Sequence, residues 1–135
     1  MTLLATQSLW QAIYDKLDND SILMAEISGI FDPVPEGQDL PYITIGEGSS
    51  YDWSAKDFSG QEHIIDVHIW SEQKGGGQIR ALADKVSGLL VGQDLPLIGH
   101  QLIELKFIFF ENFFDENGDV RHGILRFRAN SIQNS

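Results

Sequence analysis

The chain has 135 residues and a mass of 15.1 kDa, so we expect one domain over residues 1–135 with a core large enough to fold without disulfide or metal cross-links. It has no cysteine, which excludes a disulfide framework and a thiolate metal site. Its formal net charge of −11 argues against sequence-specific DNA binding, because an acidic surface is repelled by phosphates. That acidity favours solubility, and it also suits a surface that DNA passes without binding. We expect neither a signal peptide nor a membrane span.

Apolar residues at helical spacing predict a helix over Leu3–Leu17, and Ser21 could cap a short helical turn after it. Two short strands are expected next, over Ile27–Phe31 and Tyr42–Ile45, with a loop rich in proline and glycine between them. The following polar segment, Gly46–Gly60, contains many glycines and three large aromatic residues. It is expected to be a long loop or a loose hairpin arm.

The segment Gln61–Ser71 alternates between two faces, as a half-buried strand does. Its core face is expected to hold His63, Ile65, Val67 and Ile69. Three glycines at 75–77 begin a new element, and an amphipathic helix that ends near Gly92 is predicted after them. The apolar stripe of that helix consists of Ile79, Leu82, Ala83, Val86, Leu89 and Leu90.

The remaining residues predict a long hairpin, with strands over Gln101–Phe113 and Val120–Ser131 and a turn at 115–119 that contains Asn-Gly. On the first strand we expect Ile103, Leu105, Phe107 and Phe109 on one face, and Leu102, Glu104 and Lys106 on the other. On the second strand, Leu125, Phe127 and Ala129 are expected to face the core. The order α-β-β-β-α-β-β predicts an α+β fold, with two principal helices on one face of a mainly antiparallel sheet.

The histidines raise the question of a metal site or a small metal-dependent enzyme. His63 and His68 point to opposite faces of one strand, so they cannot share an ion without a bulge. Asp66 and His68 share a face and could supply two ligands, but zinc usually takes three or four. A histidine hydrogen-bonded to a neighbour in the sheet is the favoured alternative. The sequence contains no complete phosphate-loop, dinucleotide-binding or nucleophile-elbow motif, and we expect neither a cofactor nor catalysis.

Two sets of residues are candidates for an interaction surface. The first lies in the polar loop and consists of Tyr51, Trp53, Lys56 and Phe58; large rigid rings in such a loop suit a partner interface. The alternative is that Trp53 folds back onto the core. The second set is Arg126 and Arg128, on the outward face of the last strand, which could pair with carboxylates of a neighbouring subunit. The alternative is local pairing with Glu104 or Asp66.

Three patches of sequence occur in an order that resembles a known family. They are Asp52–Lys56, then Glu62-His63 leading to His68–Ser71, and finally His122–Ala129. Together they are similar to the tail-completion (tail-terminator) proteins of long-tailed bacteriophages and gene transfer agents, a family formerly described as a domain of unknown function. The resemblance extends from about Leu3 to Ser131. The phenylalanine-rich segment Phe107–Phe114 departs from the family pattern.

The resemblance implies a small α+β domain that assembles as a hexameric ring at the head-proximal end of the tail tube. Such a ring stops tube polymerisation and presents the surface that joins the head. The implied partners are further copies of the chain, the tail tube protein and a head–tail connector or adaptor, and DNA passes through the lumen without sequence-specific binding. The implied location is the virion tail, with assembly in the cytoplasm of the host bacterium. The resemblance supplies no catalytic residue. A head–tail adaptor or a tail tube subunit is the alternative.

Overall fold

The computed structural model describes residues 4–46, 48–73, 75–115 and 119–134. The N-terminal half contains helix α1 (Thr6–Asp18), the short helix α2 (Ser21–Met24) and strands β1 (Ile30–Phe31), β2 (Tyr42–Ile45) and β3 (Ser49–Asp52). Strand β4 (Gly60–Ser71), helix α3 (Gly77–Leu90), strand β5 (His100–Phe114) and strand β6 (Arg121–Gln133) follow. The predicted first helix therefore begins at Thr6 among the described residues, and Leu3 lies outside them. Asp20 rather than Ser21 caps α2, because its carboxylate accepts from the Leu23 N–H at 2.9 Å.

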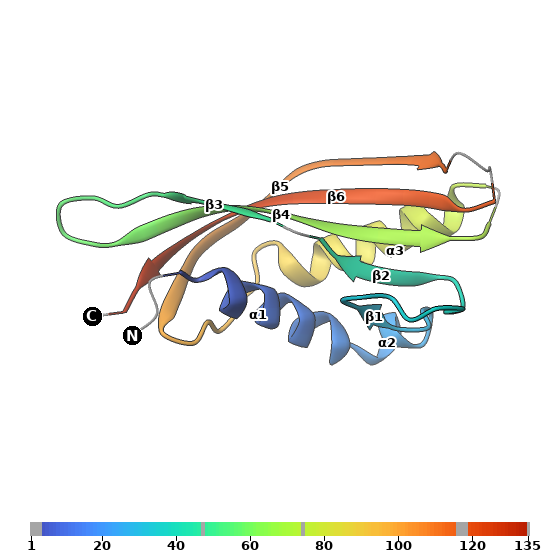
Figure 1. Cartoon of the computed structure of the whole chain (residues 1–135), viewed down its shortest axis with the longest axis horizontal. Coiled ribbons are helices and arrows are strands. Elements are labelled where there is room, and N and C mark those ends of the chain that lie inside the picture. The colour runs from blue at the N-terminus through green and yellow to red at the C-terminus, as the bar shows by residue number, and fades with distance from the viewer. Residues whose placement is uncertain (1–3, 47, 74, 116–118, 135) are drawn as a thin grey trace.

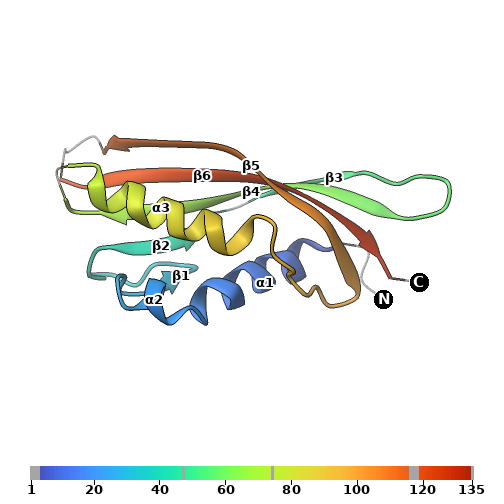
Figure 2. The same cartoon turned by 180° about the vertical axis from the view of Figure 1, so that it is seen from behind.

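All six strands belong to one sheet with the order β1-β2-β4-β6-β5, and β3 pairs with β4 beside β2. Every pairing is antiparallel except the parallel contact of β1 with β2. Both long helices, α1 and α3, lie on one face of this sheet (Figures 1 and 2). The predicted α+β class and the predicted order of elements are confirmed, and β3 is an additional strand within the segment expected to be a loop or a hairpin arm.

The core forms where the helices cover the two central strands, β4 and β6. Residues alternate along both strands, so that one side chain in two points toward α1 and α3. The core side of β4 carries Ile65, Val67 and Ile69, and that of β6 carries Leu125, Phe127 and Ala129, as expected. Helix α3 approaches β6 closely at Gly123, where an added Cβ would lie 2.9 Å from the Ile79 Cδ1 atom. A larger residue at 123 would require the Ile79 and Phe110 side chains to shift.

The predicted faces of β5 are partly wrong, because two irregularities interrupt its pairing with β6. The register shifts between Leu102 and Glu104 and again between Phe107 and Phe109. Each bulge adds one residue and reverses the side to which the following residues point. Leu105 and Phe107 therefore still share the helix side, together with Leu102, which was expected on the opposite face. Ile103 falls within the first bulge, and Phe109 lies opposite Arg126 on the outer face.

Candidate functional site

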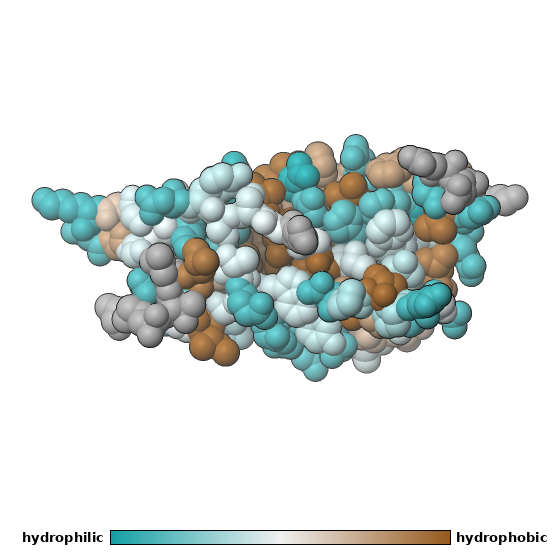
Figure 3. Space-filling view, in the orientation of Figure 1, coloured by the Kyte–Doolittle hydropathy of each residue, from teal (hydrophilic) through white to brown (hydrophobic). Residues whose placement is uncertain are grey.

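The most prominent local feature is the hairpin arm, which we define as residues 49–62. Strand β3 pairs with the first half of β4 from Ser49↔Ile64 to Asp52↔Gln61. The hairpin continues through a backbone bond from the Trp53 N–H to the Gly60 carbonyl, 2.8 Å long, and a bridge between Ala55 and Phe58. The arm projects from one end of the elongated molecule (Figures 1 and 3). The expectation of a hairpin arm, one of two left open by the sequence, is correct.

The tip of the arm, residues 51–58, is exposed at every position. Its three large rings keep much of their surface open: the exposed fraction is 55% for Tyr51, 39% for Trp53 and 36% for Phe58. Trp53 and Phe58 pack on each other, with ring centroids 5.6 Å apart, and neither belongs to the core cluster. Trp53 therefore does not fold back onto the core. Lys56 lies in the same exposed turn, so the structure brings the four loop candidates together.

The two candidate arginines lie on the outer face of the sheet and pair within the chain. The Arg126 guanidinium donates two hydrogen bonds to the Asp66 carboxylate, at 2.8 and 3.0 Å, and this raises the pKa of Arg126 above its usual value. It also lies over the Phe109 ring, 4.7 Å from the centroid. Arg128 is 3.8 Å from Glu62, while Glu104 pairs with Lys106. The local pairing considered for Arg126 is confirmed, and the partner of Arg128 is a carboxylate that the sequence did not indicate.

A stack of aromatic and histidine rings lies beside this charged cluster on the outer face. The Trp70 and His122 rings are stacked and almost parallel, with centroids 3.7 Å apart, and Tyr42 and Phe113 lie at the two sides of the stack. The His68 Nδ1 and His122 Nε2 atoms are 2.7 Å apart and share a hydrogen bond. Burial lowers the pKa of both histidines, and the neighbouring His68 helps to bring the pKa of His122 to about 4. Both rings are therefore neutral at neutral pH.

This arrangement does not supply a metal centre within the described residues. Asp66, one of the two ligands considered, is held by Arg126, and His68 is held by His122. In the described part of the chain, no group of three or more histidine, aspartate or glutamate side chains is placed to hold an ion. His63 points to the core side, as expected, and lies between the Ser50 and Ser131 hydroxyls at 2.7 and 2.9 Å.

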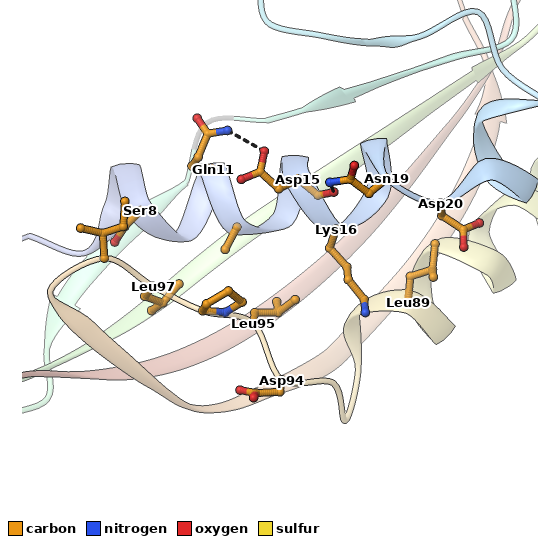
Figure 4. A pocket seen from close by; sticks show the side chains of 13 residues that line it. Ser8, Gln11, Asp15, Lys16, Asn19, Asp20, Leu89, Asp94, Leu95 and Leu97 are labelled. Carbon is orange, nitrogen blue, oxygen red and sulfur yellow. Dashed lines mark hydrogen bonds between the residues drawn. The ribbon is translucent and has the colours of Figure 1, made fainter.

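A separate cleft of about 550 Å³ lies between α1 and the loop that precedes β5 (Figure 4). Charged side chains line it, among them Asp15, Lys16 and Asp94. The Asp15 carboxylate accepts a hydrogen bond from Gln11 at 2.8 Å, and its backbone carbonyl accepts one from the Asn19 amide. These polar groups are satisfied along the helix itself, so the cleft shows no converging set of catalytic groups among the described residues.

Within the described ranges, the structure has no helix that is long and apolar enough to cross a membrane.

Comparisons with known proteins agree with the fold and with the sequence patches. The family profile described as Tail completion protein gp17 matches residues 11–130. The chain is 26% identical over 129 residues to the Tail completion protein gp17 of Bacillus phage SPP1, which covers 93% of this chain and 92% of that protein. A chain from the virion of a native gene transfer agent particle superposes with a TM-score of 0.88 and 27% identity, over 98% of this chain and 100% of that one. The solved structure of bacteriophage SPP1 gp17 shares the fold, with a TM-score of 0.66 and 22% identity over 97% and 91% of the two chains.

These likenesses define the class as the tail-completion proteins found in virions of tailed phages and gene transfer agents. Within that class, the chain belongs to the Tail completion protein gp17 family, because the family profile spans most of its length.

Proposed function

We propose that this chain forms a ring at the head-proximal end of the tail tube, stops tube polymerisation and presents the surface that joins the head. The observation that supports this most strongly is the likeness, over nearly the whole chain, to a protein of a gene transfer agent virion. The proposed partners are further copies of the chain, the tail tube protein and a head–tail connector. Assembly takes place in the bacterial cytoplasm, and the finished ring stays in the virion tail.

The mechanism is physical and requires no catalysis. A subunit that binds its neighbour through two different surfaces closes into a ring if the rotation between neighbours divides a full turn. A closed ring has no free end, so when it is bound to the last ring of the tube it covers the surface on which the next tube subunit would add. The exposed aromatic tip of the arm and the part of the sheet edge at β5 that the helices leave uncovered are two such different surfaces.

Native mass measured by light scattering at low and high protein concentration tests the ring. One discrete mass of a closed oligomer is expected, either free or after mixing with purified tail tubes. The mixture should also end tube growth, so tubes assembled with the protein present should be shorter than tubes assembled alone. Growth of the protein by itself into long tubes would identify a tube subunit instead, and binding to heads without any effect on tube length would identify an adaptor.

The acidic excess is proposed to line the lumen or the outer rim of the ring, where it lets DNA pass without binding. Exposed carboxylates can be changed to lysine in sets, one set for each helix or loop, in particles that still assemble. The set that lines the lumen should slow DNA ejection, because lysine attracts phosphates. An unchanged rate of DNA ejection for every set would show that the carboxylates do not line the lumen.

A further inference from the structure

The sheet is wider than the pair of helices that covers it. Helix α3 packs across β4 and β6 and only reaches the side of β5, which is the last strand of the sheet. A groove of about 330 Å³ remains between α3 and β5, with Phe107 and Phe110 on its floor. The exposed fraction of Phe107 is 48% although it points to the helix side of the sheet. We name this feature the β5 groove.

An apolar groove beside a long edge strand is a surface that proteins normally cover. Helix α3 forms one wall of the β5 groove. This wall carries a positive charge, Arg80, and a negative charge, Asp84, one helical turn apart. Both are exposed, and neither takes part in an ion pair among the described residues. An occupant that fits should therefore bring apolar rings together with adjacent charges of both signs.

The tip of the hairpin arm has this composition. Its rings, Trp53 and Phe58, flank Lys56 and Asp57, which are two exposed charges of opposite sign that form no ion pair within the described residues. Asp57 is suited to Arg80, and Lys56 to Asp84. A single chain cannot make this contact with itself, because the arm projects from one end of the molecule and α3 begins at the other (Figures 1 and 2).

We propose that the tip of the arm of one copy docks in the β5 groove of the next copy around the ring. The proposal rests on the ring of the proposed function and names the two surfaces that close it. Each subunit supplies one arm and one groove, so the contact is heterologous and every arm and groove is used once the ring closes. Aromatic side chains that dock in an apolar pocket with charges at the rim are the usual centre of a strong protein contact.

Charge reversal in mixtures tests this pairing. The Asp57→Arg variant has a defective arm and an intact groove, and Arg80→Glu has the opposite combination. Each variant alone should need at least a tenfold higher protein concentration to form rings, because like charges then meet in every contact. In an equimolar mixture, the reversed arm meets the reversed groove and the unchanged arm meets the unchanged groove. Rings of alternating composition should therefore reappear at close to the wild-type concentration.

Glu104→Arg is the matched control for Asp57→Arg, since it makes the same change of charge on the outer face of the sheet, where Glu104 pairs with Lys106. It should leave the ring intact. Rings are measured by native mass in solution and by subunits bound per tail-tube end, with a thermal melt to show that each variant is folded. If the wild type forms rings but the mixture does not recover, or if either variant alone forms rings normally, this pairing is wrong and the ring stands. If the wild type forms no ring in either setting, the proposed function fails as well.

Discussion

The body of the sheet and the arm tip are two regions of opposite character, and the difference separates what stabilises the protein from what it offers to partners. In the body, Ile65, Val67 and Ile69 are almost completely buried beneath the helices; all three pair with β6, and Val67 and Ile69 also pair with β2. Before β4 begins, the chain runs through the arm tip, where every residue from 51 to 58 is exposed. Burial of apolar area stabilises the first region, whereas the second contributes little to folding and is free to bind.

The largest expected effect of a single change is in the body. Phe127→Ala removes a fully buried ring at the centre of β6 and should lower the free energy of unfolding by about 3–5 kcal/mol. Phe58→Ala at the arm tip is the matched control and should change it by less than about 0.5 kcal/mol. Urea denaturation of the two variants measures both values. Equal losses at the two positions would contradict the separation of body and arm.

A buried polar contact at the base of the arm should have an intermediate effect. His63 is hydrogen-bonded on both sides, to Ser50 of β3 and to Ser131 of β6. His63→Ala leaves two hydroxyl groups without this partner in a largely buried place and should lower the free energy of unfolding by about 2 kcal/mol. Ser131→Ala, which removes one contact only, should cost less. A His63 variant as stable as the wild type would show that water replaces the ring at no cost.

Acid should weaken the body through the histidines of the outer face. Burial and the neighbouring His68 hold the pKa of folded His122 at about 4, below the value of about 6.5 in the unfolded chain. Between these values the unfolded state binds more protons, so the stabilisation from neutral His122 is complete above about pH 6.5 and is lost as the pH falls toward 4. The loss should be on the order of 1 kcal/mol for a half-exposed ring. Unfolding measured against pH should show a flatter profile for His122→Gln, and parallel profiles would rule out this contribution.

The sequence predicted the regular parts of the fold because their signals are local. The alternation along Gln61–Ser71 and the apolar stripe of α3 each lie within one element, and both elements occur as expected. The faces of β5 could not be predicted in the same way. Its two bulges are defined by the pairing of β5 with β6, and a run of apolar residues does not show where they fall. The phenylalanine-rich segment was noted as unusual, but only the structure shows that part of it forms a groove.

The candidate site was predictable as a set of residues but not as a set of contacts. The aromatic rings in a polar loop indicated the arm tip, and the structure leaves those rings exposed. The outward alternation indicated Arg126 and Arg128, but the choice of partners depends on the register between β4 and β6, which places Asp66 opposite Arg126 and Glu62 opposite Asn130, diagonal to Arg128. That register also brings His122 beside His68, a pair separated by 54 residues. No periodicity within one strand carries this information.

The smallest expected effect on stability is at Trp53, and the same residue should have a large effect on assembly. Trp53 lies at the exposed tip, where its ring packs against Phe58, so Trp53→Ala should change the free energy of unfolding by less than about 0.5 kcal/mol. A rigid ring at the centre of a contact often contributes 2 kcal/mol or more to binding, so ring formation or tube binding should weaken by about tenfold or more. Tyr42→Ala, which shortens the ring stack on the sheet instead of the tip, is the comparison variant. Thermal melts and native mass on the same samples separate the two effects. An unfolded Trp53 variant would show that the residue belongs to the folded body. A folded variant that assembles normally would show that Trp53 is not part of the interface.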